Sequence, residues 1–349
     1  MSAKFLPISD FCVRTHGASC RRCSIACPAH AIEFAGETSA PTIDHEVCTG
    51  CGICMGICDG FSSTRVTIQD LHSRIRRIGL RGEAVYLTCK ENILPDFTPA
   101  ENVIVLPCLA LVPTELWTLI LAQNIPVCIV CDLRYCEECT IAPNRGEMLF
   151  SRAIETAEDF TGGKVRWDHQ VPEKRDVSHV LTDETGYGRR EAFDSIKDDV
   201  TDVLSGKRRL KNSEVLQDYY ERRERNRAIQ RLNISGSSIN KFAPHGVTRK
   251  VLFPHHEMLL DAAIENPSVS TAILMTISET DMTKCAGHTD CVATCITGAR
   301  SLSKLDGSLE YDARLCIGCG ACVDTCPEGA IRLIDTTAYD VLEMTTPNA

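Results

Sequence analysis

The sequence predicts an α+β protein of several domains, in which two cysteine-rich modules flank an α/β domain with a parallel sheet. Three observations predict this arrangement. Cysteine clusters with the same spacing stand near both ends of the chain, and the segment between them alternates β-rich and helical patterns. The length of 349 residues also suffices for about two to three domains, each with its own core. We place the N-terminal module at residues 1–75, the α/β domain at 76–175, a charged helical linker region at 176–245 and the C-terminal module at 246–349.

One cysteine spacing occurs twice and decides how both modules are interpreted. The run CIGCGACVDTCP carries Cys316, Cys319, Cys322 and Cys326, and the run CTGCGICMGIC carries Cys48, Cys51, Cys54 and Cys58. Both follow the bacterial spacing for iron–sulfur clusters, in which three cysteines hold one cubane and the fourth binds a second one. Three cysteines on one tight loop can bind three corners of a cube, but the next cysteine of that loop cannot reach the remaining corner. The paired loops of a module are therefore expected to exchange their last cysteine.

Each module also contains an earlier cysteine loop and a predicted hairpin. AHAIEF and PTIDHE flank the turn GETSA in the first module, whereas ARSLSKL and LEYDA flank DGS in the second, and GAIRLID follows as a further strand. This plan resembles the two-cluster, 2[4Fe–4S] bacterial-type ferredoxins. In the N-terminal module the resemblance implies one cluster on Cys12, Cys20, Cys23 and Cys58 and another on Cys48, Cys51, Cys54 and Cys27. Two departures are the insertion VRTHGAS between Cys12 and Cys20 and an aspartate, not a proline, after Cys58.

The first loop of the C-terminal module has a histidine where the family has its second cysteine. This loop contains, in order, Cys285, His288, Cys291 and Cys295. The resemblance implies a complete set of Cys316, Cys319, Cys322 and Cys295, and a second set of Cys285, Cys291 and Cys326 with His288. Three outcomes compete at His288: a histidine-ligated cubane, a three-iron cluster with the histidine as a bystander, or no cluster. We favour ligation because His288 is in register, and imidazole in place of thiolate should raise the reduction potential.

Zinc is the alternative for the terminal modules. Structural zinc sites use two CxxC pairs around one tetrahedral ion, and loops with three cysteines fit that pattern poorly. The chain has 21 cysteines, and their clustering without a secretory signal favours metal ligation over disulfides. We therefore expect four [4Fe–4S] clusters in the two modules, one of them histidine-ligated or of the three-iron type.

The segment between the modules has the alternation of an α/β domain. Its β-rich stretches are bounded by turn residues and its helical stretches are longer, which favours a parallel sheet with helices on its faces. The expected strands are 84–89, 102–108, 126–131 and 164–169, and the expected helices are 114–123 and 146–160.

Cysteines stand where three of these strands end. Cys89, Cys108 and Cys131 fall at carboxyl ends, the edge at which open α/β sheets bind ligands, so we expect them to converge. Cys136 and Cys139 follow shortly after and could line the same crevice. The sequence therefore predicts a third metal-binding region in the middle of the chain.

At these residues the segment resembles the delta subunit of methyl-viologen-reducing hydrogenases, an iron–sulfur protein that links hydrogenase to heterodisulfide reductase. The shared pattern is a cysteine after a strand, a helix, a second strand, and then Cys131 and Cys136. The chain departs from that family by lacking a paired CxxC at Cys89. We expect a [2Fe–2S] cluster on Cys89, Cys108, Cys131 and Cys136. A zinc ion on Cys128, Cys131, Cys136 and Cys139 is the alternative; otherwise Cys128, inside a strand, is expected in the core.

The linker region is polar and has no metal-ligand pattern. Residues 213–232 predict a helix with Ser213 as N-cap, and several arginines make it basic. We interpret it as a solvated helix with i to i+4 ion pairs, the alternative being a docking surface for an acidic partner. Residues 236–246 have the composition of a linker.

Composition and charge restrict the partners. The net charge of −10 disfavours nucleic acid and anionic membrane surfaces as ligands of the whole chain. No run of apolar residues reaches the length of a membrane-spanning helix and no secretory signal is visible, so a cytoplasmic location without membrane insertion is expected.

The missing motifs favour an electron carrier over an enzyme. No GxGxxG after a strand, P-loop, HExxH or Ser/His/Asp constellation is present, so we nominate no catalytic residues. The sequence predicts an iron–sulfur electron-transfer subunit of a multi-subunit oxidoreductase, relaying single electrons between a partner's flavin, molybdenum or nickel–iron centre and an acceptor. The alternatives are a redox-sensing or assembly factor, and a stand-alone reductase that uses the His288 cluster.

Overall fold

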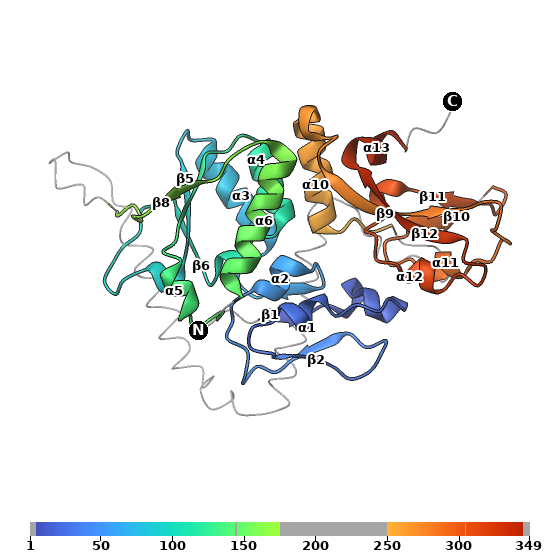
Figure 1. Ribbon diagram of the computed structural model, residues 1–349, viewed down its shortest axis with the longest axis horizontal. Helices are drawn as coiled ribbons and strands as arrows, with labels where there is room; N and C mark the ends of the chain where they lie inside the picture. The colour runs from blue at the N-terminus through green and yellow to red at the C-terminus, as the bar shows by residue number, and fades with distance from the viewer. Residues whose placement is uncertain (1–4, 144, 175–249, 304, 345–349) are drawn as a thin grey trace, which may run out of the picture.

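The computed structural model of the chain describes residues 5–143, 145–174, 250–303 and 305–344 (Figure 1). The predicted helix at 213–232 and the linker at 236–246 lie outside these residues. Within the described ranges, no helix has the length and apolar character needed to cross a membrane.

The α/β domain is built on a four-stranded parallel sheet, as predicted. Each predicted strand is present, and the closing strand 164–169 pairs with its predecessor along the chain. The spatial order is β6-β5-β7-β8, with β5 at Val85–Cys89, β6 at Val103–Leu106, β7 at Val127–Val130 and β8 at Arg166–Asp168.

The two central strands of the sheet are buried. Val85 and Leu87 of β5, and Val127 and Ile129 of β7, are all buried. The edge strand β8 is exposed along its whole length and carries charged residues. The sheet is thus buried at its centre and polar at its β8 edge.

Two long helices cover one face of this sheet. The helices α4 (Thr114–Ala122) and α6 (Gly146–Thr161) pack against each other, and in Figure 1 they separate the sheet from α10. The helix α4 is apolar around its whole circumference because it is covered on several sides, and its Trp117 is 0% exposed. The short helices α5 (Arg134–Glu137), η3 (Lys90–Asn92) and η4 (Leu109–Leu111) follow the strand ends.

The helix α3 (Ile68–Gly79) connects the N-terminal module to the sheet. Thr67 and Asp70 form a reciprocal capping box at its start, and Ile68, Leu71 and Ile75 lie on its buried side. The boundary that we predicted between residues 75 and 76 falls inside this helix. Residues of this amphipathic helix pack into the core on both sides of that position, as Ile75 and Ile78 show.

The N-terminal module consists of two antiparallel pairs and two short helices around the cysteine loops. The predicted hairpin is present as β2 (Ile32–Phe34) and β3 (Pro41–Ile43). The second antiparallel pair joins the first and last strands of the module, β1 (Phe5–Pro7) and β4 (Phe61–Ser63). The helices are α1 (Arg22–Ala26), α2 (Ile53–Ile57), η1 (Ser9–Phe11) and η2 (Val13–His16).

The C-terminal module repeats this plan. Its predicted hairpin is β10 (Arg300–Leu302) with β11 (Leu309–Tyr311), and its short helices are α11 (Asp290–Ala293) and α12 (Ala321–Asp324). The predicted strand GAIRLID is β12 (Ile331–Thr337), whose partner β9 (Leu274–Thr280) the sequence analysis missed. The remaining elements are η5 (Pro267–Val269), η6 (Ala313–Leu315) and α13 (Ala338–Glu343).

The helix α10 (Pro254–Glu265) joins the two halves of the molecule (Figure 1). It packs on α4 of the α/β domain and on α13, so it belongs as much to the central core as to the C-terminal module. It lies within residues 246–349, the range that we assigned to the C-terminal module, and that assignment stays a prediction. At its start, the backbone N–H of His255 donates to Asp59 Oδ1 at 3.0 Å, and the rings of Phe253 and Phe11 meet edge to face.

Candidate metal centres

Four N-terminal cysteines surround a cavity of about 340 Å³. They are the predicted set Cys27, Cys48, Cys51 and Cys54. Cys27 comes from the other loop, so the exchange of the last cysteine is present in the geometry. Gly52, in the left-handed region with φ 82°, turns the second loop so that α2 starts directly behind it. The backbone N–H of Ala31 donates to Cys27 Sγ at 3.4 Å.

The complete set of the C-terminal module has the same architecture. Its cavity of about 330 Å³ is lined by Cys295, Cys316, Cys319 and Cys322. Ser278 of β9 donates its backbone N–H to Cys316 Sγ at 3.3 Å. A positive-φ glycine again precedes the helix, here Gly320 with φ 80° before α12. The two modules thus place their loop cysteines with the same local structures.

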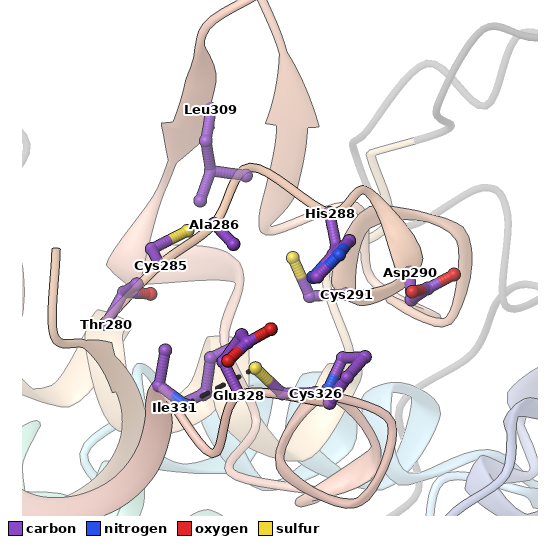
Figure 2. A pocket seen from close by; sticks show the side chains of 12 residues that line it. Thr280, Cys285, Ala286, His288, Asp290, Cys291, Leu309, Cys326, Glu328 and Ile331 are labelled. Carbon is purple, nitrogen blue, oxygen red and sulfur yellow. Dashed lines mark hydrogen bonds between the residues drawn. The ribbon is translucent and has the colours of Figure 1, made fainter. Parts of the chain in front are cut away.

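The histidine-containing set lines a third cavity of about 330 Å³ (Figure 2). In the close-up, His288 and Cys291 come from the same loop, Cys285 lies across the cavity from them, and Cys326 stands below. The backbone N–H of Ala330 donates to Cys326 Sγ at 3.4 Å. The structure therefore brings His288 together with the three cysteines with which the sequence grouped it. Its side chain lies at an exposed part of the surface.

The fourth predicted set is grouped around the start of α1. Burial raises the pKa of Cys23 to about 11, and the neighbouring Cys20 and Cys12 raise it further in the same direction. Burial likewise raises the pKa of Cys58 to about 12, with Cys23 and Cys20 among the smaller causes. Cys58 Sγ also accepts the backbone N–H of Gly60 at 3.3 Å. Cys20 and Cys23 are thus neighbours of both Cys12 and Cys58.

The donor sets fit [4Fe–4S] clusters. Each set offers thiols around a cavity or in one buried group, and several of the sulfurs accept backbone N–H groups, which is a feature that tunes cluster potentials. The raised pKa values show that burial disfavours free thiolates there, whereas an iron centre would hold them deprotonated. Across the described residues, no three Cys, His, Asp or Glu side chains converge closely enough for a single metal ion, since the sulfurs are spaced around cavities.

The middle cysteines also converge, as the strand ends predicted. Asn92 Nδ2 donates to Cys89 Sγ at 3.0 Å and to Cys131 Sγ at 3.4 Å. Cys131 Sγ lies 3.9 Å from Cys136 Sγ. Asn92 was missed in the sequence analysis, although a polar residue three positions after Cys89 was a visible signal. Its amide ties together cysteines from two strands.

Cys108 and Cys139 complete the middle group. Burial raises the pKa of Cys108 to about 12, and Cys51, Cys89 and Cys139 add smaller repulsions. Cys139 Sγ accepts the backbone N–H of Ala142 at 3.4 Å. Cys108 therefore stands between the middle group and the N-terminal cavity that contains Cys51.

Cys128 lies apart from this group. It is 4% exposed, as expected of a core cysteine, and the charged groups that influence its pKa are Asp168 and Arg166 of β8, after the dominant effect of burial. The zinc set requires Cys128 beside Cys131, Cys136 and Cys139. The geometry accordingly gathers the four cysteines of the [2Fe–2S] set, and the choice of metal stays a prediction.

A broad cleft of about 1800 Å³ opens beside Cys131, at the carboxyl ends of β5, β7 and β8. The sequence analysis did not identify it. Acidic side chains dominate its charged lining, although Arg134 and His169 also face it. The acidic residues are Glu91, Asp132, Asp168 and Glu173.

Two comparisons with known proteins bear on these sites. A family model described as a 4Fe-4S binding domain matches residues 309–332, the segment that carries Cys316, Cys319, Cys322 and Cys326. The ferredoxin-type protein NapF of Haemophilus influenzae is 35% identical over 69 residues, which are 19% of this chain and 38% of that protein. The chain thus spans well under half the length of the relative that it matches.

These matches confirm a 4Fe–4S binding domain near the C-terminus and suggest an iron–sulfur electron-transfer role. The mixed α/β architecture around a parallel sheet is shown by the structure itself. The N-terminal clusters, the individual ligands and the resemblance to the hydrogenase delta subunit stay predictions.

Proposed function

We propose that this protein is an iron–sulfur electron-transfer subunit of a larger cytoplasmic oxidoreductase, with two dicluster modules flanking the α/β domain. It relays single electrons between a partner's flavin, molybdenum or nickel–iron centre and an acceptor. Clusters held by cysteine sets of this kind supply one-electron transfer over roughly −700 to +450 mV. The observation that carries the proposal is that the five candidate sites adjoin one another in a row.

The first contact joins the middle group to the N-terminal module. Cys108 has both Cys89 and Cys51 as electrostatic neighbours. Thr49, within the cysteine loop, donates its hydroxyl to the carbonyl of Ile141 at 2.6 Å, two residues after Cys139. The loops that carry both sites are therefore held directly against each other.

The second contact lies inside the N-terminal module. The helix α1 carries Cys23 and is followed by its C-cap Cys27, and these two cysteines belong to different sets. The helix α2 carries Cys54 and is followed by its C-cap Cys58, which likewise belong to different sets. Because α1 packs on α2, the two N-terminal sites share one interface.

The third contact joins the two modules. The hydroxyl of Thr294, next to Cys295, donates to the carbonyl of His16. Ile8 and Phe11 of the N-terminal module pack in one apolar cluster with Ile296, and Ile317 adds to it. Ile317 lies between two cysteines of the complete C-terminal set, so that set adjoins the N-terminal module. The exposed His288 set is the last site of the row, next to the complete C-terminal set.

The proposal is tested on the full chain purified without oxygen. We expect iron and inorganic sulfide sufficient for four [4Fe–4S] clusters and the middle centre, together with a co-purifying protein that contains a flavin, molybdenum or nickel–iron centre. Reduction by that partner should produce cluster signals in electron paramagnetic resonance (EPR). A colourless protein that contains zinc in place of iron and sulfide refutes the proposal.

The exposure of His288 gives a second candidate function, a reductase that works alone at this site. Glu328 and Asp290 line the same cavity and could bind a small substrate or move a proton. Turnover of an electron acceptor by the isolated protein, abolished in His288→Ala, supports this function. Turnover that requires the partner supports the relay.

A further inference from the structure

We infer that Arg300 tunes both sites of the C-terminal module, by holding a permanent positive charge between them that raises the reduction potential of the clusters they bind. The inference rests on the proposed function, because it requires these sites to be loaded. It assigns a role to a residue that no cysteine motif contains.

Arg300 is almost completely buried. It stands at the start of β10 and is 1% exposed. Its Nη1 donates to Thr280 Oγ1 at 2.6 Å and its Nη2 to Ser278 Oγ at 3.0 Å, and the guanidinium carbon lies 5.0 Å from the ring centre of Tyr311. Its Nε is buried and has no hydrogen-bond partner among the described residues.

All these partners of the guanidinium are neutral. No carboxylate pairs with Arg300 within the parts of the chain that the structure describes. A buried cation is unfavourable unless a negative charge or a strong set of acceptors compensates it, and an arginine cannot lose its proton in a protein. The compensating charge therefore has to come from the cysteine sites that the residue adjoins.

Both cysteine sites of the module feel this charge. Arg300 lines the cavity of the complete set, together with Cys316 and Cys322. Its Nη1 donates to Thr280 Oγ1, and Thr280 lines the cavity of the His288 set. The guanidinium therefore adjoins both sites of the module.

The physical effect on a loaded site has a definite sign. Reduction adds one negative charge to a cluster, and a nearby fixed cation stabilises the more negative state. Because Arg300 is removed from water, its charge is screened less than that of a surface residue. It should therefore favour the reduced form of both C-terminal clusters.

The N-terminal module provides an internal comparison. Ile32 follows Cys27 by five positions, as Arg300 follows Cys295, and each starts the first strand of its hairpin. Ile32 is buried and lines the matching cavity of its own module. The same position thus carries an apolar side chain in one module and a cation in the other. Electrons should be held more tightly at the C-terminal sites.

The test compares Arg300→Gln, Arg300→Lys and Arg332→Gln in the full chain. Arg332 is the matched control, because it is an exposed arginine of the same module that pairs with Glu279. The readout is a redox titration of each cluster followed by EPR. In Arg300→Gln we expect the ratio of reduced to oxidised C-terminal cluster at a fixed potential to fall about tenfold, which corresponds to 59 mV for one electron.

The other variants decide between charge and shape. Arg300→Lys keeps the charge and should shift the potentials less than Arg300→Gln, whereas Arg332→Gln and the N-terminal clusters should be unchanged. Equal potentials in Arg300→Gln and wild type, with full iron content, overturn the inference and leave the relay intact. If Arg300→Gln loses its C-terminal clusters, retention of clusters and potentials in Arg300→Lys supports the role of charge, and equal loss in both variants refutes it. A wild type without iron refutes both proposals.

Discussion

The N-terminal and C-terminal modules build their cysteine cavities with the same parts but place different charges around them. Both use a hairpin, a turn with a left-handed glycine and two short helices, and both exchange the last cysteine between loops. Two of the differences lie at the cysteine sites themselves, Cys20 against His288 and Ile32 against Arg300. Each exchange makes the C-terminal module less negative. Two sites of equal shape can therefore differ in electron affinity, which gives a relay its direction.

The largest expected effect comes from removing one cysteine from each complete set. Cys51→Ala and Cys319→Ala should each lose one cluster, because a cubane with three protein thiolates and a buried apolar replacement is held poorly. Iron and sulfide analysis with EPR measures the loss. Unequal losses would show that the two modules hold their clusters by different means. Cys128→Ala is the control, since this cysteine lies outside all five groups and should keep full iron content.

A change in spectrum is the next largest effect, and it addresses the first difference between the modules. His288→Cys recreates the residue pattern of the N-terminal loop and should lower the potential of that cluster, because a thiolate adds negative charge. His288→Ala should convert the site to a three-iron type or empty it. EPR of the two variants and the wild type measures both effects. Unchanged spectra in both variants remove His288 from the ligand set.

The buried His256 of α10 predicts that acid lowers the stability of the folded protein. Burial lowers the pKa of His256 to about 4, and its ring Nε2 lies 2.9 Å from the carbonyl oxygen of Arg314. Because the unfolded chain takes up a proton near pH 6.5 and the folded one does not, the free energy of unfolding falls as the pH drops from 6.5 to 4. His256→Gln should remove up to about 3 kcal/mol of this loss.

Chemical denaturation at pH 7.5 and pH 4.5 measures the difference between His256→Gln and wild type. The stabilisation should be seen only at the lower pH. A difference independent of pH contradicts the burial of a neutral imidazole. Burial raises the pKa of Glu257 to about 7, so protonation of this residue increases the free energy of unfolding as the pH falls. Glu257 is present in both proteins, so its contribution cancels in the comparison.

The smallest effect concerns how the modules contact the α/β domain. A Cβ added at Gly56 would lie 2.5 Å from the carbonyl oxygen of Ala110 and 2.8 Å from that of Leu111. Gly56→Ala should therefore destabilise the protein by about 2 kcal/mol through overpacking. The corresponding residue of the other module, two positions after Cys322, is the exposed Asp324, and Asp324→Ala should cost almost nothing. Unfolding in denaturant measures both changes. Equal losses of unfolding free energy in Gly56→Ala and Asp324→Ala would refute the predicted difference between the two modules.

The local parts of the sites could be predicted from the sequence because they are encoded by short spacings. The triple-cysteine loops, both hairpins and the cysteines at the ends of β5, β6 and β7 lie where their patterns indicated. A loop with two residues between cysteines leaves few backbone paths, and parallel strands bring their carboxyl ends to one edge. Such features need no knowledge of the rest of the chain.

The features that were missed depend on distant contacts. The strand β9 gains its pairing from β12, more than fifty residues later, and α10 has the uneven pattern PHHEMLLDAAIE because it faces several neighbours at once. The approach of Cys108 to Cys51 depends on η4 packing against α2 at Gly56. None of these pairings has a signal within a short window, so spacing alone could not reveal the order of the sites.

The position of α10 has a mechanical consequence. This helix carries residues 254–265 back onto α4, and Asn266 Nδ2 donates to the carbonyl of Ala122 at 3.4 Å. The α/β domain and the C-terminal module are thus held together by non-covalent packing as well as by the covalent chain. A protease that cut the backbone between residues 175 and 249 would leave two fragments that stay associated, and their separation would need a denaturant.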